Sequence, residues 1–390
     1  MESYSFLIFS FLDNFLFVLY SILVLYLLVF SIASLKHTTM ERGEPSLLRR
    51  IVVLLPAYRE DSVIEESVQA CLEQDYPKDK FDVVVISDQM QDSTNSRLLE
   101  LPIRFIKIEF ENPTKAKSLN FALDQLADYD IAVVLDADNL METQFLSKIN
   151  YAFDTGSVIA QAHRTAKNTN TNYAILDAVS EEVNNSIFRK GHVNLGLSAA
   201  LIGSGMAFDF QYFKSLMKQV KVVGGFDKDL EHLVLWDGKK IDYIDDAFVY
   251  DEKIQVNAHF TKQRRRWMAA QFEHFVKYNS LFLKALFKGN FDFCDKVFQM
   301  VFPPRILILG GVILMMTFAV LVKNVDMHKW LFDLFLLGVS LFVATPKWLI
   351  NRRLFKAIFS LPSIFMWMVL NLFNLKGANT QFIHTPHGKL

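Results

Sequence analysis

The stretch IAVVLDADNL at residues 131–140 decides the fold, because it joins an apolar strand pattern to a pair of carboxylates. Five apolar residues in a row are typical of a strand that is buried on both faces. Asp136 and Asp138 follow directly, and the period-two alternation of a strand tip would place both side chains on one face. Two close carboxylates repel each other, so we expect a positive partner between them or a position open to water. A solvated turn capped by an aspartate is the alternative interpretation.

Strand and helix patterns alternate on the N-terminal side of this stretch. Strands are predicted at residues 50–55, ending at Pro56, and at 82–87, 104–108 and 131–135, with helices at 62–73 and 116–126. Such alternation with short connections predicts an α/β fold with a largely parallel sheet. Ligands bind beyond the carboxyl ends of the strands in such sheets. Three strand ends carry polar groups that we expect to converge: Tyr58-Arg59-Glu60, Asp88 and Asp136-Ala137-Asp138.

The pattern that follows is less regular. Residues 198–208, SAALIGSGMAF, predict a strand–turn–strand, 227–235 a helix, 241–245 and 248–250 short strands, and 262–275 a basic helix. Residues 281–301 mix Phe and Leu with a few charges. They predict an amphipathic segment in the membrane interface, with an ordinary packed helix as an equal alternative.

The two ends of the chain are strongly apolar. Of the 390 residues 52% are hydrophobic and 36 are Phe, and residues 15–35 carry no charge. That run is long enough to cross a hydrocarbon layer of about 30 Å, and too long for a cleavable signal. Residues 306–322, 331–345 and 357–375 are further candidate spans. The middle one is short and contains Asp333, so a buried soluble helix is its alternative.

Basic residues set the expected orientation. Lys and Arg cluster after the first span and between the last two, which predicts that residues 36–300 lie in the cytoplasm of a multi-pass protein of the cell (inner) membrane. The expected domains are a transmembrane helix at 1–35, a cytoplasmic domain at 36–275, an interface segment at 276–303, three transmembrane helices within 304–376 and a tail at 377–390. A net charge of −1 does not indicate binding to nucleic acid. The two cysteines are far apart in the sequence and do not indicate a disulfide.

The acidic pair fits a hard cation. Mg²⁺ takes one or two protein carboxylates together with phosphate oxygens, so a metal bound by Asp136 and Asp138 would bridge the protein to a diphosphate. His384 and His387 in the tail are a much weaker metal motif, because two histidines alone are usually surface residues.

Five motifs occur in a fixed order: PAYRE at 56–60, Asp88 after a strand, TKAKSLN at 114–120, DADN at 136–139 and QRRRW at 263–267. Over residues 48–275, and in its membrane layout, the chain resembles the membrane-embedded family 2 glycosyltransferases. That group contains cellulose, chitin, hyaluronan and poly-N-acetylglucosamine synthases. The resemblance implies a GT-A-like, Rossmann-like cytoplasmic domain with α-helical transmembrane segments, and Mg²⁺ or Mn²⁺ as cofactor.

The resemblance also implies a role for each matched residue. The nucleotide base and ribose would be lined by Ala57, Tyr58 and Glu60, with Asp88 bonded to the uracil. Lys115 would lie near the diphosphate, and Asp136 and Asp138 would hold the sugar nucleotide and the metal. Gln263, Arg266 and Trp267 would close over the pyrophosphate and the acceptor. The basic run before Trp267 has an anionic-lipid patch as its alternative role, Trp267 could be a core aromatic, and GSGM at 203–206 could be only a tight turn.

In this family the catalytic Asp usually lies within a Thr-Glu-Asp triplet, and this sequence contains no such triplet. Residues 224–232 read GGFDKDLEH, and the spacing from Asp227 to Gly238 matches the family pattern, while Asp229 and Glu231 remain rivals. Phe226 stands where the family has Glu, and Arg59 where it has Asn.

The expected function is inverting, metal-dependent transfer of a sugar, UDP-linked by expectation, to a polysaccharide or lipid-linked glycan at the membrane. Processive synthesis is one form of this. A non-processive transferase onto a polyprenyl phosphate or lipid is one alternative, and a non-catalytic nucleotide-binding subunit of an export complex is another. The expected partners are the nucleotide sugar, the acceptor and the bilayer, with any partner subunits left open.

Overall fold

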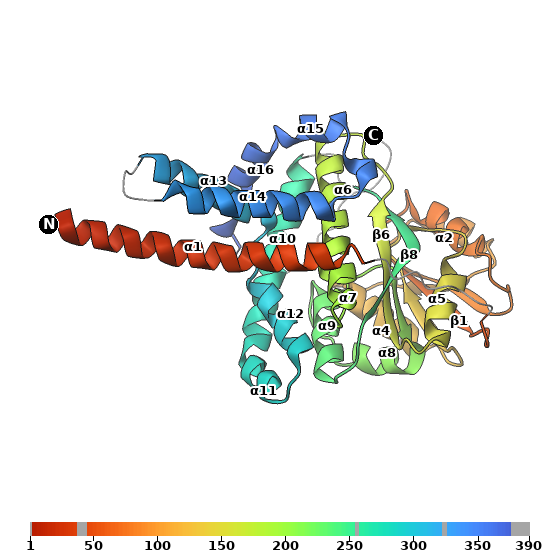
Figure 1. The fold of residues 1–390 in the computed structure, drawn as a ribbon. Coiled ribbons are helices and arrows are strands. Elements are labelled where there is room, and N and C mark those ends of the chain that lie inside the picture. The colour runs from red at the N-terminus through yellow and green to blue at the C-terminus, as the bar shows by residue number, and fades with distance from the viewer. Residues whose placement is uncertain (1, 37–44, 254–256, 322–325, 376–390) are drawn as a thin grey trace.

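The computed structural model describes residues 2–36, 45–253, 257–321 and 326–375, and the tail with His384 and His387 lies outside them. An eight-stranded sheet forms the centre of the molecule, in the order β3-β2-β1-β4-β7-β6-β8-β5 (Figure 1). The strands are β1 (Ile51–Tyr58), β2 (Phe81–Asp88), β3 (Arg104–Ile108), β4 (Ile131–Val134), β5 (Leu140–Met141), β6 (Ile159–Ala166), β7 (Met206–Asp209) and β8 (Asp242–Asp251).

The first half of the sheet is parallel, as the alternating pattern predicted. β1 pairs in parallel with β2 and β4, and β2 pairs in parallel with β3. β7 is antiparallel to both β4 and β6, β6 is parallel to β8, and β5 closes the edge antiparallel to β8. The α/β class with a mostly parallel sheet is therefore confirmed.

Helices cover both faces of the sheet, because its strands are apolar on both sides. In β1, Val52 and Leu54 face one core while Val53 and Leu55 face the other, and all four are fully buried. Each such side chain contributes roughly 1.5–3 kcal/mol by leaving water. One face is covered by α4 (Lys115–Asp124), α8 (Phe210–Met217) and α9 (Phe226–Trp236), and the other by α2 (Ile64–Leu72), α3 (Asp92–Leu99) and α5 (Phe145–Asp154).

The predicted strands differ from the observed ones in three segments of the chain. β1 does not end at Pro56 but continues to Tyr58; β4 pairs only with Ile51–Leu54, so the proline lies where β1 has a single neighbour and no second ladder needs its missing N–H. Of the predicted strand–turn–strand at 198–208, the turn is present, with Gly203 and Gly205 at positive φ angles of 81° and 63°, and Met206 onward is a strand. The first segment is not a strand, because its backbone N–H groups donate to the carbonyls of Ile241 and Phe188 and form no regular ladder. The two short strands at 241–250 are one strand, β8, whose residues 245–247 form an irregularity opposite Ala162 and His163 of β6.

A long helical layer lies against the end of the sheet. It begins with α6 (Asn172–Asn184), continues as a π-helix, η1 (Asn185–Gly191), and ends with α7 (His192–Asn194). The remaining helices are α1 (Glu2–Ala33), α10 (Asn257–Tyr278), η2 (Asn279–Leu281), α11 (Phe282–Phe287), α12 (Phe291–Val301), α13 (Arg305–Leu321), α14 (Met327–Ala344), η3 (Lys347–Leu349), α15 (Arg352–Ile358) and α16 (Leu361–Leu372).

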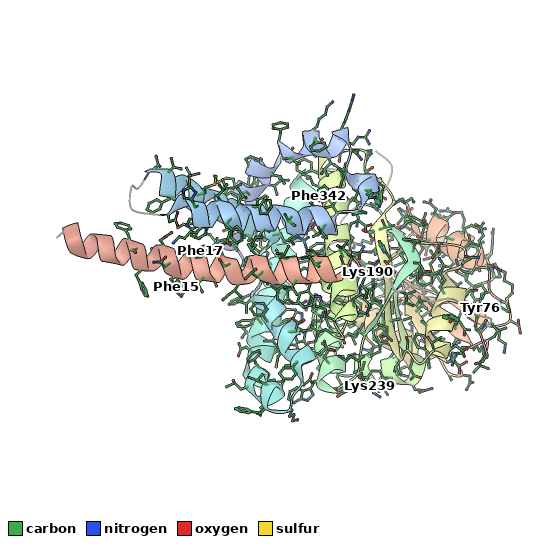
Figure 2. The ribbon with its side chains drawn as sticks, in the orientation of Figure 1. Phe15, Phe17, Tyr76, Lys190, Lys239 and Phe342 are labelled. Atoms are coloured by element: carbon green, nitrogen blue, oxygen red, sulfur yellow. The ribbon has the colours of Figure 1, made fainter. Side chains whose placement is uncertain are left out.

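Two described helices are long and apolar enough to cross a membrane by themselves, residues 9–33 of α1 and α14. Two bent pairs, α12 with α13 and α15 with α16, raise the number to four if each pair is one span. α1 and α14 run side by side, and Figure 2 shows Phe15 and Phe342 projecting away from them. Both rings are mostly exposed in the isolated chain, as expected of side chains that face lipid.

The segment predicted to lie in the interface has two parts. α12 is a packed helix that buries Phe293, Lys296 and Val297, whereas α11 leaves Leu283 and Phe287 exposed at 61% and 88%. α12 thus has the form of the packed-helix alternative, and α11 keeps an apolar face that suits an interface.

Candidate active site

The ends of β1 and β2 lie next to each other, as predicted for a base-binding region. Tyr58 is paired in register with Asp88, and the backbone N–H of Arg59 donates to the Asp88 carbonyl at 3.2 Å. The Asp88 side chain is buried, and burial raises its pKa. Its Oδ2 is buried and has no hydrogen-bond partner among the described residues, so it keeps an unused acceptor position at the end of β2. Ala57 is buried beside this pair.

The acidic motif does not share a strand face, contrary to the prediction. β4 ends at Val134, and a turn follows in which the backbone N–H of Asn139 donates to the Asp136 carbonyl at 3.2 Å. The turn breaks the period-two alternation, so the Asp136 side chain is about one-third exposed whereas Asp138 is buried.

Lys115 supplies the positive partner that the acidic pair requires. Its ammonium group contacts the Asp136 carboxylate and donates to the carbonyl oxygen of Gly203 at 2.7 Å. The same group lies 5.3 Å from the centre of the Phe226 ring, at the start of α9. Lys115 thus joins α4, the turn after β4, the glycine turn and α9.

Asp138 is in an unfavourable place for a lone negative charge. Burial raises its pKa well above the usual range, and the charges of Asp251 and Asp136 raise it further, while Arg164 opposes them. A divalent cation would relieve this repulsion, and carboxylate oxygens are its preferred ligands, so the donor set fits a metal. Among the described residues no group of three or more His, Cys, Asp or Glu could hold a metal without help. Substrate oxygens would have to complete the shell.

Asp227 and Arg266 lie on the same side of the molecule as Lys115 and Asp136. Asp227 is in the first turn of α9 and half-buried, and a Cβ atom placed on Gly203 would come within 3.9 Å of its side chain. Burial lowers the pKa of Arg266, and the nearby charges of Asp136 and Asp227 raise it. This guanidinium therefore interacts electrostatically with both carboxylates. The helix N-terminus also favours a negative charge at Asp227.

The rivals of Asp227 point into the protein instead. Asp229 is fully buried and accepts bonds from Lys277 at 2.5 Å and from the Tyr278 hydroxyl at 2.6 Å, both in α10. Glu231 is also fully buried; it accepts from Lys228 at 2.9 Å and from the backbone N–H of Leu201. Neither carboxylate is placed to meet a substrate.

The other QRRRW residues lie on α10 near the site. Trp267 is 40% exposed, so it is not a core residue, and Arg264 covers one face of its ring at 4.7 Å. Arg264 also forms an ion pair with Asp177 of α6. The Oε1 atom of Gln263 is buried without a hydrogen-bond partner in the described part of the chain. Glu60 lies in the loop after β1, two residues beyond Tyr58.

A buried polar network behind the acidic turn was missed by the sequence reasoning. It comprises Asn139, Arg164, Glu181, Arg189, Ser204, Asp251 and Lys253. Its one signal in the sequence was a set of charged side chains among small and apolar residues, in stretches too polar to predict a buried strand. Arg164, in the strand IAQAHRTA, is the clearest case, because a charge at such a position needs a buried partner.

Comparison with known proteins agrees with this fold. Residues 49–270 match the family described as "Glycosyltransferase like family 2". The chain is 25% identical over 244 residues to a beta-monoglucosyldiacylglycerol synthase of Trichormus variabilis. The aligned region covers 60% of this chain and 51% of that protein. It is 30% identical over 119 residues to the probable glycosyltransferase YdaM of Bacillus subtilis, 27% of this chain and 28% of that protein. The chain thus matches about half the length of one relative and less of the other.

A solved structure resembles the chain almost throughout. The mannosyltransferase PcManGT from Pyrobaculum calidifontis, in complex with GDP-Man and Mn²⁺, matches with a TM-score of 0.57 over 93% of this chain and 98% of that one. At 16% identity this likeness shows a common fold. The family match extends over more than half of the 390 residues and includes every predicted site residue, from Ala57 to Trp267. The chain therefore belongs to the glycosyltransferase-like family 2.

Proposed function

We propose that this protein transfers a sugar from a nucleotide sugar to a hydroxyl group of a lipid or glycan acceptor at the membrane, with inversion at the anomeric carbon. The observation that carries the proposal is the meeting of Lys115, Asp136, Asp227 and Arg266. These residues come from four separate segments of the chain, and two of the charges balance the other two. Family membership and the membrane-type helices support the same reading.

The donor would bind along the carboxyl ends of β1, β2 and β4. Asp88 would accept a bond from an N–H of the base once the bound donor uncovers its buried Oδ2, which no described residue bonds, and Tyr58 and Ala57 lie on the neighbouring strand β1. Lys115 and Arg266 would neutralise charge that grows on the leaving diphosphate, which is where fixed positive groups lower a barrier most. A divalent cation held by Asp136 and Asp138 would, when bound, add Lewis-acid stabilisation of the same oxygens.

Asp227 would be the general base. As the acceptor oxygen attacks the anomeric carbon from the face opposite the diphosphate, its proton passes to the Asp227 carboxylate. The bond from the anomeric carbon to the phosphate oxygen breaks, and the nucleoside diphosphate leaves. A positioned base contributes about 10²–10⁴-fold to such a step. Asp229, the second candidate base, is bonded to Lys277 and Tyr278 and would instead hold α9 in place.

A lipid acceptor has specific support. The relative from Trichormus variabilis is named as the synthase of a glycolipid, and its similarity extends over 60% of this chain. In this chain α1 packs against α14 and against the π-helix η1, which brings the sugar-transfer domain close to the expected membrane surface (Figure 1). We therefore place single-sugar transfer onto a lipid ahead of processive polymer synthesis, with the sugar-transfer domain in the cytoplasm and the protein in the inner membrane.

The test is a donor screen with the full-length protein in membranes. Release of nucleoside diphosphate is followed for UDP- and GDP-sugars, with and without Mg²⁺ or Mn²⁺, and product length is measured by mass. Asp136→Asn and Asp227→Asn should both lower the rate of release strongly, the latter by about 10²–10⁴-fold. A protein that binds nucleotide but shows no release with any donor and acceptor would instead be a non-catalytic subunit. Long products at every donor concentration would show processive synthesis.

A further inference from the structure

Asn139 is the residue around which the acidic turn is organised. Its side chain is fully buried and makes three hydrogen bonds within and behind this turn. Nδ2 donates to Asp138 Oδ1 at 3.2 Å and to Asp251 Oδ1 at 3.0 Å, while Oδ1 accepts from the Ser204 hydroxyl at 2.5 Å. The amide has two N–H donors and an acceptor oxygen, so no other orientation satisfies these three partners.

Ser204 connects this amide to the other carboxylate. Its hydroxyl oxygen accepts from the backbone N–H of Asp136 at 3.0 Å, while its proton goes to Asn139. Ser204 is fully buried, and its own backbone carbonyl accepts from Gln161 at 3.0 Å. Two neutral side chains thus fix the two acidic residues of the turn relative to each other.

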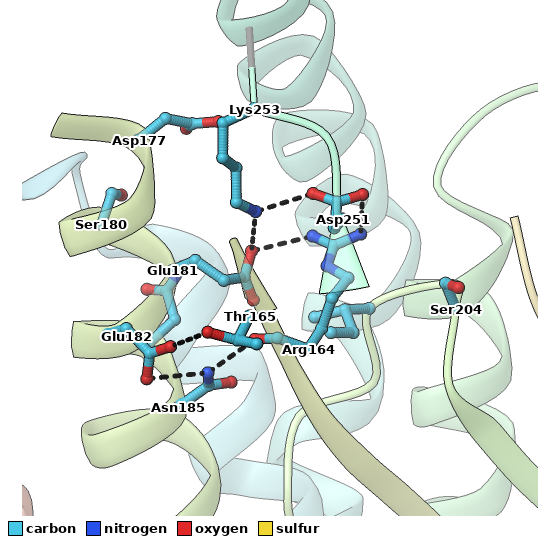
Figure 3. Close-up of polar contacts among 12 residues, drawn as sticks. Arg164, Thr165, Asp177, Ser180, Glu181, Glu182, Asn185, Ser204, Asp251 and Lys253 are labelled. Atoms are coloured by element: carbon cyan, nitrogen blue, oxygen red, sulfur yellow. Dashed lines mark hydrogen bonds and ion pairs between the residues drawn. The ribbon is translucent and has the colours of Figure 1, made fainter. Parts of the chain in front are cut away.

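An ion network holds Asp251 behind Asn139. Figure 3 shows the Asp251 carboxylate facing Lys253 and Arg164, which in turn meet Glu181 of α6. The separations are 2.7 Å from Lys253 to Asp251 and 2.8 Å from Arg164 to Glu181. Only 2% of the Lys253 side chain and 8% of that of Glu181 are exposed. Asp251 is therefore a fixed point, and a single amide separates it from Asp138.

We propose that Asn139, oriented by Ser204 and Asp251, is the positioning residue that presents the Asp138 carboxylate to a divalent cation. Asn139 would touch neither the cation nor the substrate. Its amide supplies one bond that holds Asp138, and it separates two carboxylates that would otherwise repel each other out of place. This inference rests on the cation site of the proposed function.

The experiment measures Mn²⁺ binding by the purified full-length protein from the loss of the free Mn²⁺ signal in electron paramagnetic resonance, with UDP or GDP present. Asn139→Leu keeps the volume and removes the three bonds. We expect it to weaken Mn²⁺ binding on the order of tenfold or more, as losing a bond to a charged group does. Ser204→Ala removes a single hydroxyl and should weaken binding in the same direction by a smaller factor.

Asn150 provides a matched control. It is also fully buried, and it also makes three such bonds, to Arg49, Tyr76 and Leu47 on the far side of the domain. Asn150→Leu should lower Tm as Asn139→Leu does but leave Mn²⁺ binding unchanged. In a cation titration of sugar transfer, Asn139→Leu should raise the Mn²⁺ concentration for half-maximal rate and leave the acceptor KM unchanged.

The outcomes separate this inference from the proposed function. Wild-type Mn²⁺ affinity in Asn139→Leu, or equal weakening in Asn150→Leu, overturns the positioning role even if sugar transfer is found. Where Asn139→Leu does not fold, wild-type affinity in Ser204→Ala overturns it. Binding of Mn²⁺ that depends on Asn139, in a protein that transfers no sugar, upholds the positioning role and overturns the proposed function.

Discussion

Lys115 and Asp136 form an ion pair that joins the start of α4 to the turn after β4. Lys115 also donates to the Gly203 carbonyl at 2.7 Å, so its ammonium group is held between two loops. A diphosphate or a cation that enters this site must therefore exchange partners with a pair already formed. The N-terminus of α4 lies at the same point and adds positive potential for an anionic donor.

Lys115→Met should weaken the binding of the nucleotide-sugar donor far more than the binding of the cation. The diphosphate loses a charged hydrogen-bond donor, so we expect the KM for the nucleotide sugar to rise on the order of tenfold or more. Mn²⁺ binding without nucleotide should not weaken, because the Asp136 carboxylate loses a competing cation. Lys117→Met, also on α4 but with its ammonium bonded to the exposed Asn112 carbonyl, is the control. An unchanged KM in Lys115→Met would remove Lys115 from the donor site.

Asp227→Asn and Asp229→Asn should fail in different ways. The first should lower kcat by about 10²–10⁴-fold with nearly unchanged donor KM and Tm, because Asp227 is only half-buried and no hydrogen bond from another described residue is lost with it. The second should lower the free energy of unfolding by on the order of 1–3 kcal/mol, and Tm with it, because Lys277 and Tyr278 lose a charged acceptor. Calorimetry and single-turnover rates decide between them. The reverse pattern would make Asp229 the base.

His163 gives the stability of the domain a definite pH dependence. Burial lowers its pKa, but bonds and charges from Asp245 and Glu182 outweigh burial and raise the pKa to about 9. A histidine with a raised folded pKa adds stability that is complete below its unfolded value, about 6.5, and is lost as the pH rises towards 9. We expect Tm to fall between pH 6.5 and 9.

The measurement compares thermal unfolding of the wild type and His163→Gln across this range. The variant should be less stable at pH 6.5 and should lose less stability on the way to pH 9. His328→Gln, at an exposed position in α14, should retain the wild-type slope. A wild-type slope in His163→Gln would show that the ring is not charged in the folded protein.

The fold was predictable wherever the strand pattern was local. Residues 82–87 and 131–135 are apolar runs that end in carboxylates, and both became parallel strands with those carboxylates at the expected edge. At residues 198–208 the turn and the second strand were predicted, but the first strand was wrong, because small apolar residues have strand-like patterns whether or not a neighbouring strand pairs with them. β5 and β6 were missed, since β5 has two residues and β6 carries His163 and Arg164.

The candidate site was predictable as a set of residues but not as an arrangement. The five motifs named Lys115, Asp136 and Arg266, yet no pattern indicated that one ammonium would join Asp136 to the glycine turn. The choice between Asp227 and Asp229 rested on spacing alone. It depends on which side of α9 faces Tyr278, and that is a property of how α9 packs on α10. The Asn139 network could not be predicted for the same reason, because it also depends on how separate elements pack together.

Gly191 is a point of close approach between the first helix and the sugar-transfer domain. A Cβ atom there would lie 2.1 Å from the carbonyl oxygen of Phe30, and the neighbouring His192 ring stacks on the Phe30 ring at 3.7 Å. Gly191→Ala must therefore push α1 away from η1. We expect a loss of stability on the order of 1–3 kcal/mol, as for other overpacked contacts, measured by thermal unfolding in detergent.

The same change should also reduce activity, because η1 supports the site. Arg189 of η1 donates to the Ala200 carbonyl at 3.2 Å, in the segment that leads to Gly203 and hence to Lys115. We expect kcat to fall in Gly191→Ala, whereas Gly338→Ala should match the wild type, because nothing lies within 4 Å of a Cβ atom at that position of α14. Wild-type stability and rate in Gly191→Ala would mean that α1 does not rest on η1 in the working enzyme. The anchor and the site would then be mechanically independent.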